Sequence, residues 1–239
     1  DKEAIKVTLD AASLPVGLPE GHQGSSEMGH LMIGAGRPVV FPQTQVKNAL
    51  QNNLIRENAV YREVMEYCRD NKKKLHLFGL LSDRGVHAYA DLCFQLLRLA
   101  KEIGVEKVAV HIIADGRDTT PRELPVFIEQ LQKVMAEINL GEIASVVGRY
   151  YAMDRDQRWE RVEQAYRLYT EGKGCQVKEI GSFLDAYYAE SKDFNTNGLA
   201  YTDEFIPPAI LKPELIMDSN DGIIFWNFRV DRAGEITQA

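Results

Sequence analysis

Strand-length apolar runs alternate with helix-length amphipathic segments, and this alternation constrains the fold more than any other feature of the chain. Four apolar runs have the length of buried strands: Leu75–Leu81, Lys107–Ile113, Ile143–Val147 and Gly222–Trp226. The first three are each followed by a polar turn and then by a segment with apolar residues at helical spacing: Ala88–Ile103, Pro121–Ile138 and Gln157–Thr170. Repeated strand–turn–helix units predict an α/β fold with a mostly parallel sheet flanked by helices.

The first forty residues have a different pattern. They are rich in glycine and proline and show little helical periodicity, with one weak strand expected at Ile5–Leu9. Short helices are expected at Val46–Leu54 and Ala59–Arg69. The change in pattern predicts a domain boundary near Arg37–Phe41.

Composition and charge exclude several classes of protein. An apolar content of 45% is ordinary for a globular chain of 239 residues, and no run approaches the length of a membrane span. The net charge of -7 argues against a general nucleic-acid binder. Three scattered cysteines form no disulfide framework or metal clip, which favours a reducing, cytoplasmic compartment.

Arginines cluster in the segments that follow the expected strands. Parallel strands bring their carboxyl ends to one edge of a sheet, where ligands bind, and guanidinium groups form bidentate hydrogen bonds with phosphates and carboxylates. These positions predict a local site for a small anion. The alternative is that each arginine pairs with a nearby aspartate, such as Asp118, Asp154, Asp156 or Asp231. The arginines concerned are Arg84, Arg117, Arg149, Arg155, Arg229 and Arg232.

Two aspartates and one histidine in these segments are candidates for a catalytic or ligand-binding role. Asp115 and Asp118 flank Arg117, where a carboxylate can act as a base toward a substrate hydroxyl; the alternatives are an Asx turn and a helix cap. His87 is expected at the start of a helix, where an imidazole can hydrogen-bond a phosphate; a structural or exposed histidine is the alternative.

The other histidines and the serines give weaker signals. His111 lies in an apolar strand and is expected in the core, while His22, His30 and His76 lack the spacing of metal ligands. Ser25 and Ser26 lie in a glycine-flanked loop, where a serine is either an activated nucleophile or a helix cap.

Six segments together resemble the cofactor-independent phosphoglycerate mutases, members of the alkaline-phosphatase superfamily. They occur in the order of that family and span nearly the whole chain. The segments are LPEGHQGSSEMGHLMIGAGR (Leu18–Arg37), GLLSDRGVH (Gly79–His87), ADGRDTTP (Ala114–Pro121), GRYYAMDRDQRWERV (Gly148–Val162), TDEFIPP (Thr202–Pro208) and NFRVDRA (Asn227–Ala233).

The resemblance implies a two-domain enzyme that interconverts 3-phosphoglycerate and 2-phosphoglycerate. Residues 1–40 would be a fragment of its phosphatase domain, and 41–239 would be its inserted transferase domain, truncated at the C-terminal end. Ser26 matches the serine that becomes phosphorylated and contacts the metal. Two divalent ions, expected to be manganese, act in such an enzyme, and 2,3-bisphosphoglycerate is not required. A cytoplasmic monomer is expected, with no nucleic-acid or membrane partner.

The resemblance also assigns the substrate contacts. The matching positions are His87, Arg117, Asp118, Arg149, Arg155, Arg229 and Arg232. Asp118 is the candidate for the acid/base step, and the arginines would hold the glycerate while the phosphoryl group moves. These residues lie in the same loops in which the arginine pattern predicts an anion site.

The sequence departs from the family pattern in several places. Arg84 stands where glycine is usual, Ser25 stands where asparagine is usual, and Ala88–Tyr89 replaces a common Ser-His. No residue matches the remaining metal ligands or the catalytic lysine of the family. We therefore expect that this chain alone does not complete turnover. A phosphoglycerate-binding module without turnover and another metal-dependent phosphomutase, such as a phosphopentomutase, remain alternatives.

Overall fold

The computed structural model describes residues 10–18, 20–21, 24, 26–190 and 201–239. The expected strand at Ile5–Leu9, as well as Ser25 and His22, lie outside the described residues. Contacts within the chain group it into two compact units, 1–52 and 53–239. The functional division between residues 40 and 41 stays a prediction.

In the described part of the first unit, a short 3-10 turn is followed by two helices, α1 (Ser26–Ala35) and α2 (Pro42–Gln51). Its small core consists of Val16, Leu18 and Phe41. Gly17 permits the chain to pass close to itself, because it has a φ of 75° and a Cβ there would overlap the carbonyl of Val39. The backbone of Ser26 begins α1, which agrees with a helix start after the glycine-flanked loop.

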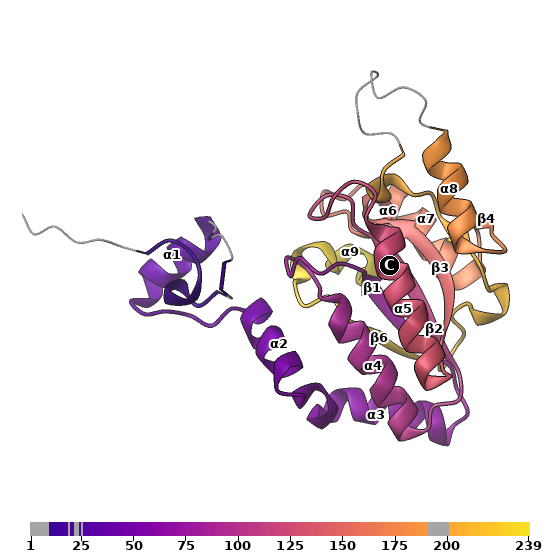
Figure 1. Cartoon of the computed structure of the whole chain (residues 1–239), viewed down its shortest axis with the longest axis horizontal. Coiled ribbons are helices and arrows are strands. Elements are labelled where there is room, and N and C mark those ends of the chain that lie inside the picture. Colours follow the sequence, from indigo (N-terminus) through magenta and orange to yellow (C-terminus); the bar gives the residue numbers. More distant parts are fainter. Residues whose placement is uncertain (1–9, 19, 22–23, 25, 191–200) are drawn as a thin grey trace, which may run out of the picture. The chain divides into compact units, whose positions relative to one another are not determined.

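The second unit is built on a six-stranded sheet in the order β4-β5-β3-β2-β1-β6 (Figure 1). The four neighbouring strands β3, β2, β1 and β6 are parallel, as the sequence pattern predicts. Only β5 runs antiparallel to its neighbour β3 among the described pairings. The strands are β1 (Leu75–Leu80), β2 (Val108–Ala114), β3 (Glu142–Gly148), β4 (Cys175–Gln176), β5 (Ala209–Ile210) and β6 (Gly222–Phe225).

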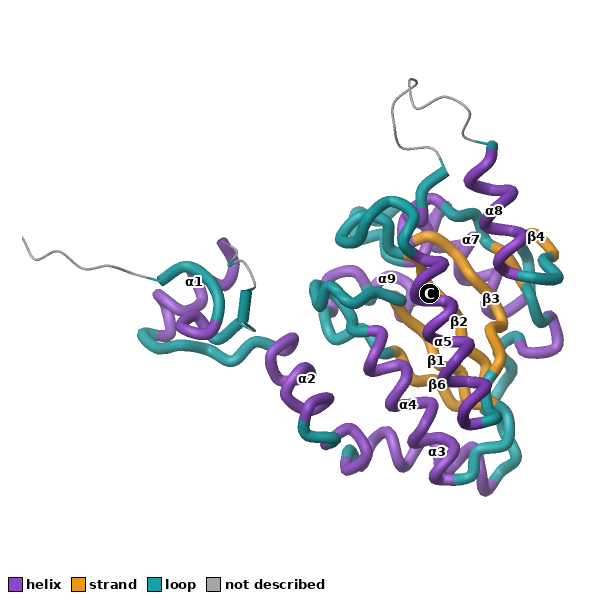
Figure 2. The backbone as a smooth tube through the Cα atoms, viewed as in Figure 1, coloured by secondary structure: helices purple, strands orange, loops and turns teal. Residues whose placement is uncertain are grey.

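Helices cover both faces of this sheet (Figure 2). On one face α3 (Ala59–Asp70), α4 (Ala90–Ile103) and α5 (Leu124–Ile138) lie side by side, with the Cys68 sulfur of α3 against Gly222. On the opposite face the Tyr169 ring of α7 (Trp159–Glu171) meets Phe78 edge-on, at 4.5 Å between centroids. Strands β1 and β2 are buried along their whole length, because both faces are covered.

The sequence pattern located the main helices but not all their ends. α4 ends at Gly104, which has a φ of 92°, as expected for a glycine stop. α5 begins at Leu124 rather than Pro121, because Pro121 and Arg122 form a turn and the Asp203 carboxylate, distant in the sequence, accepts from the N–H of Leu124. Short strands β4 and β5 and the helices α6 (Arg149–Ala152), α8 (Ile180–Ala189) and α9 (Gly234–Gln238) were not predicted.

A chain of hydrogen bonds crosses the buried sheet, and we call Ser145, His111, His76 and Asp221 the histidine network. Ser145 Oγ lies 2.8 Å from His111 Nδ1, and His111 Nε2 lies 2.9 Å from His76 Nδ1. His76 Nε2 lies 3.1 Å from Asp221 Oδ2. The expectation that His111 belongs to the core is confirmed, since it is fully buried.

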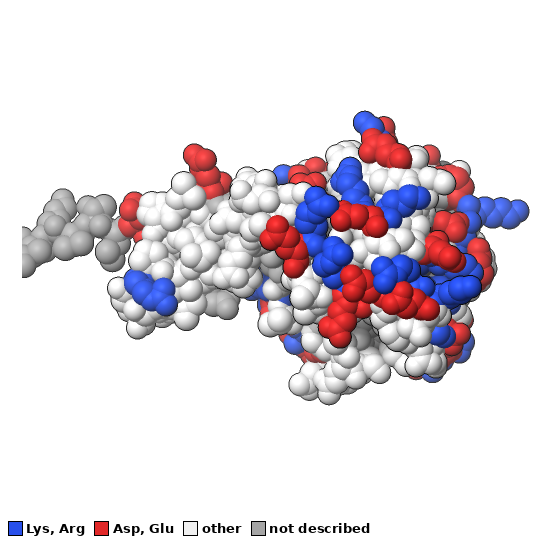
Figure 3. Space-filling view, turned by 90° about the horizontal axis from the view of Figure 1, so that it is seen from below, with Lys and Arg blue, Asp and Glu red and all other residues white. Residues whose placement is uncertain are grey.

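Surface charges alternate in sign. In Figure 3, lysine and arginine side chains are interleaved with aspartate and glutamate on the face in view. Among the described residues, no helix has the length and apolar character needed to cross a membrane.

Candidate anion-binding site

The parallel strands β1, β2, β3 and β6 bring the segments that follow them to one edge of the sheet. His87 lies in the loop between β1 and α4, and Arg117 and Asp118 lie in the loop after β2. Arg149 opens α6 directly after β3, while Arg229 and Arg232 follow β6. The topology therefore explains how residues from four parts of the chain reach one place.

Arg149 is the buried centre of this cluster. Its side chain is 3% exposed, and its Nη1 lies 2.5 Å from Asp115 Oδ1 and 2.6 Å from Asp118 Oδ2. Burial opposes the charge of Arg149, but Asp115 and Asp118 outweigh it and keep the guanidinium pKa raised. Burial likewise opposes the carboxylate of Asp115, yet Arg149 and the N–H of Asp118 hold its pKa below the ordinary value.

His87 is buried beside these charges without a close partner for one ring nitrogen. Its Nδ1 has no hydrogen-bond partner and lies 3.7 Å from Asp231 Oδ1, while its Nε2 lies 3.9 Å from Asp118 Oδ2. Burial, and next the positive charge of Arg149, lower the pKa of His87 to about 4. The imidazole is therefore neutral at pH 7 and retains unused hydrogen-bonding capacity.

The surroundings of Arg232 indicate that several arginine side chains lie close together. Burial lowers the pKa of its guanidinium, and the nearby charges of Arg155, Arg149 and Arg117 lower it further, with Asp231 opposing them. Its Nη1 donates to the Met153 carbonyl at 3.1 Å. Repulsion among guanidinium groups is relieved by a bound anion, so this environment favours one.

The more exposed arginines pair with carboxylates. Asp231 accepts a hydrogen bond from Arg155 Nη1 at 3.1 Å and forms an ion pair with Arg229, whose Nε lies 3.0 Å from Asp231 Oδ1. Arg117 Nη2 lies 2.6 Å from Glu204 Oε1. The alternative of pairing with Asp118 or Asp231 is therefore present for Arg149, Arg155 and Arg229, whereas Arg117 pairs with Glu204, which the sequence pattern did not indicate.

The Asx-turn alternative is correct for Asp115, whose Oδ1 accepts from the N–H groups of Arg117 and Asp118. The helix-cap alternative for Asp118 is wrong. Asp203 Oδ2 instead accepts from the N–H groups of Glu123 and Leu124 at the start of α5, at 2.9 and 2.8 Å. The sequence pattern indicated no role for Asp203 or Glu204, although both lie in TDEFIPP. The available signal was a pair of adjacent acidic residues shortly before Ile-Pro-Pro.

Arg84 joins two loops of the site. Its Nη2 donates to both carboxylate oxygens of Glu123, at 3.0 and 2.9 Å. Tyr89 lies close to Gly85, which has a φ of 67°, and its ring stacks at a tilt near Phe228. These two departures from the family pattern thus stabilise the loop that carries His87.

Ser26 belongs to the other compact unit, and its side chain lies outside the described part of the structure. Within the described ranges, no group of three or more histidine, cysteine, aspartate or glutamate side chains fits a metal ion. The described residues therefore do not fit the metal pair implied by the family resemblance, and we assign no chemical step through a metal to them.

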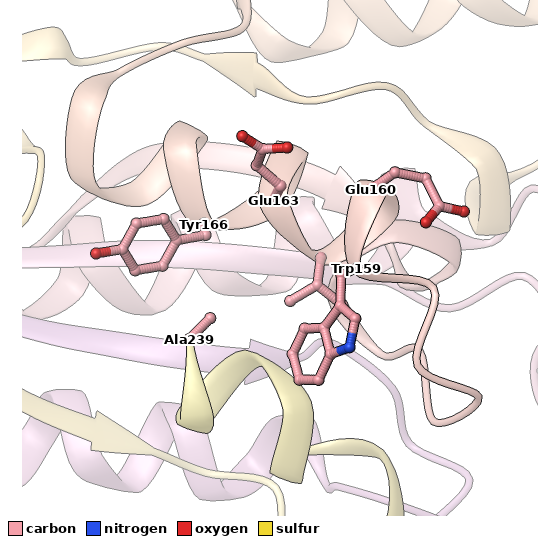
Figure 4. A pocket seen from close by; sticks show the side chains of 6 residues that line it. Trp159, Glu160, Glu163, Tyr166 and Ala239 are labelled. Carbon is pink, nitrogen blue, oxygen red and sulfur yellow. The ribbon is translucent and has the colours of Figure 1, made fainter.

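Two hollows elsewhere on the unit 53–239 are apolar. One, of about 330 Å³, lies between α7 and Ala239 and includes Trp159 and Tyr166 (Figure 4). A second, of about 510 Å³, is lined by Phe78, Tyr169 and Phe225, among others. Neither shares a lining residue with the arginine cluster, and neither offers cations for an anion.

Comparison with known proteins identifies many relatives. Residues 46–239 match the family model described as the BPG-independent PGAM N-terminus. The 2,3-bisphosphoglycerate-independent phosphoglycerate mutase of Syntrophotalea carbinolica is 43% identical over 232 residues, covering 96% of this chain and 43% of the relative. The enzyme of the same name from Lachnoclostridium phytofermentans is 45% identical over 234 residues, covering 96% and 44%.

A solved structure has a similar fold. The crystal structure of Leishmania mexicana phosphoglycerate mutase at low cobalt concentration is 30% identical, with a TM-score of 0.84, and the match covers 95% of this chain and 42% of that one. The chain therefore spans less than half the length of the relatives it matches.

Proposed function

Because this chain belongs to the 2,3-bisphosphoglycerate-independent phosphoglycerate mutase family, we propose that residues 53–239 bind phosphoglycerate for an isomerase that interconverts 3-phosphoglycerate and 2-phosphoglycerate. The observation that carries the proposal is that arginines from separate loops meet at the carboxyl edge of the parallel strands, where burial and next the charges of Arg155, Arg149 and Arg117 lower the pKa of Arg232. A ligand with a carboxylate and a phosphoryl group supplies the anions that such a cluster favours.

The residues of the cluster have distinct roles in this proposal. Arg149 is held by Asp115 and Asp118, so it keeps a fixed direction at the base of the site. The exposed arginines Arg117, Arg155 and Arg229 form ion pairs with the ligand from the surrounding loops. Neutral His87 offers one ring nitrogen as donor to a phosphoryl oxygen, a role that its unpartnered Nδ1 supports.

Asp118 is the proposed acid/base group. Its carboxylate is partly exposed and lies between Arg149 and His87, so it can reach both a ligand and solvent. It would accept the proton of the 2-hydroxyl as the phosphoryl group returns to it, and release that proton in the reverse direction.

Ser26 is the proposed nucleophile that carries the phosphoryl group between the two half-reactions as phosphoserine. For the complete enzyme the family resemblance implies two divalent metal ions, expected to be manganese, which would supply charge neutralisation; the described residues of this chain do not hold them. We place this enzyme in glycolysis and gluconeogenesis, as a cytoplasmic monomer. The isolated 239-residue chain is proposed to bind substrate without completing turnover.

Titration calorimetry of 3-phosphoglycerate into this chain tests the proposal. We expect binding to the unmodified chain and at least about tenfold weaker binding to Arg232→Ala, because a charge-assisted contact contributes about 1.5–3 kcal/mol. Arg98→Ala is the matched control, since Arg98 pairs with Glu137 on the surface and lies outside the cluster. A phosphoglycerate-exchange assay on the same samples should detect no turnover.

Three results would contradict the proposal. Equal binding by the Arg232 and Arg98 variants would remove the arginine cluster as the site. Tighter binding of ribose phosphate than of phosphoglycerate would favour a phosphopentomutase. Interconversion of the two phosphoglycerates by the purified chain would refute the assignment as a binding unit without turnover.

A further inference from the structure

A short segment crosses the carboxyl ends of two central strands, and we call Thr202–Ile206 the strap. Gly148, at the end of β3, donates its N–H to the Ile206 carbonyl at 2.8 Å, and a Cβ there would overlap the Glu204 carbonyl. A Cβ at Gly116, just after β2, would lie 2.6 Å from the Glu204 nitrogen. The strap therefore lies directly on the backbone at Gly116 and Gly148, next to Arg117 and Arg149.

The strap is anchored at its start. The Asp203 N–H donates to the Pro121 carbonyl at 2.8 Å, and the Asp203 carboxylate caps α5. Tyr188 Oη donates a short hydrogen bond to the same carboxylate. These contacts fix the backbone of the following residue, Glu204, in place.

Glu204 projects its carboxylate to Arg117 from this fixed backbone. The Glu204 side chain is 9% exposed, whereas the Arg117 side chain is 54% exposed, and the two meet at 2.6 Å. A long exposed arginine normally samples many rotamers, and ordering it costs free energy when a ligand binds. A buried, immobile carboxylate removes part of that cost in advance.

We propose that Glu204 is a positioning residue that holds the Arg117 guanidinium in place for the anion. The contact uses one edge of the guanidinium at Nη2, and a guanidinium carries five N–H donors, so others stay available to a ligand. This inference rests on the proposed binding of phosphoglycerate, and it gives Glu204 a role through Arg117 and not through contact with the ligand.

Whether Glu204→Ala weakens or strengthens ligand binding distinguishes a positioning role of Glu204 from an effect of its charge alone. Glu204 is negative, so removing its charge strengthens an anion site if charge alone matters. If Glu204 orders Arg117, Glu204→Ala instead weakens the binding of 3-phosphoglycerate by about three- to tenfold, the cost of immobilising one long side chain. Glu204→Gln keeps an oxygen acceptor for Arg117, and we expect its affinity to stay within about twofold of the unmodified chain.

A double-mutant cycle with Arg117→Ala tests whether the effect passes through Arg117. We expect Glu204→Ala to change the affinity no further once Arg117 is absent. Thermal unfolding of each variant shows whether it is folded, and Glu204→Gln, which keeps the side-chain volume, serves if the alanine variant is not. A 15N NMR spectrum adds a direct readout: the Arg117 Nε–H signal should be sharp in the unmodified chain and in Glu204→Gln, and broadened in Glu204→Ala.

Each contrary outcome is decisive. Equal or tighter binding by Glu204→Ala, or an equal loss in the Arg117→Ala background, would overturn the positioning role. Absence of 3-phosphoglycerate binding by the unmodified chain would refute the proposed function, whereas the NMR comparison would still decide whether Glu204 orders Arg117.

Discussion

Two buried polar clusters in the same sheet unit differ in how completely their groups are hydrogen-bonded. The histidine network lies within the sheet, while the cluster of His87, Arg149, Asp115 and Asp118 lies at its carboxyl edge. Both contain buried histidines whose pKa is lowered first by burial. Burial and a lowered pKa therefore do not separate His87 from the histidines of the network.

The histidine network satisfies every ring nitrogen. Asp221 accepts from His76 Nε2, so His76 Nδ1 accepts from His111 Nε2, and His111 Nδ1 accepts from the Ser145 hydroxyl. With both rings neutral and protonated at Nε2, all of these hydrogen bonds can form at the same time. Nothing in the network is left to bind a ligand, which indicates a structural role.

The cluster at the carboxyl edge of the sheet has unused hydrogen-bonding capacity. The Nδ1 of His87 has no hydrogen-bond partner, and burial, followed by repulsion from Arg155, Arg149 and Arg117, lowers the pKa of nearby Arg232. An unsatisfied buried nitrogen and crowded cations both cost free energy that an anion would recover. Incomplete hydrogen bonding of His87, more than burial, separates the cluster at the carboxyl edge from the histidine network.

The largest effect is expected from Arg149→Met. This change leaves the Asp115 carboxylate buried without its cation, and breaking a buried pair costs about 3–5 kcal/mol. Urea unfolding should show this loss, and phosphoglycerate binding should disappear. Arg98→Ala is the control, since Arg98 pairs with Glu137 on the surface and its loss should change stability by less than about 1 kcal/mol. A loss below about 1 kcal/mol for Arg149→Met would contradict the buried-pair account.

His111→Phe should come next and should affect stability alone. It leaves the Ser145 hydroxyl and His76 Nδ1 buried without partners, at a cost of about 2–4 kcal/mol. The affinity for 3-phosphoglycerate should not change in the folded variant. His87→Gln should show the opposite pattern, with weaker binding and a smaller loss of stability. Weaker binding by His111→Phe would erase the distinction between the clusters.

A smaller effect is expected in the pH dependence of binding. His87 has a pKa of about 4 in the folded chain, and a bound phosphoryl anion should raise it. Binding between about pH 4 and 6.5 should then take up as much as one proton, measured by calorimetry in buffers of different ionisation enthalpy. His87→Gln should abolish the uptake, and an unchanged uptake in that variant would exclude His87 as its source.

The same pKa fixes the sign of the acid effect on stability. Between about pH 4 and 6.5, His87 is neutral in the folded chain but protonated in the unfolded chain. Its contribution to the free energy of unfolding is therefore present above pH 6.5 and is lost as the pH falls from there to about 4. The difference corresponds to about 3 kcal/mol at full loss. His87→Gln should flatten the stability curve over this range, measured against the unmodified chain.

Much of the fold followed from local patterns. The four parallel strands and their helices were predicted because apolar spacing and glycine stops act within a few neighbouring residues. The short strands β4 and β5 were missed because two residues carry no periodic signal. The start of α5 was misplaced because Asp203, distant in the sequence, provides its cap.

The candidate site shows the same division. The sequence alone determined the family through its motifs, and it determined which loops carry the arginines, because strand order fixes where those loops meet. Only the tertiary structure decided which residue does what within them. Arg149 became the buried centre and Glu204 the partner of Arg117, because desolvation and ion pairing depend on segments that meet only after folding.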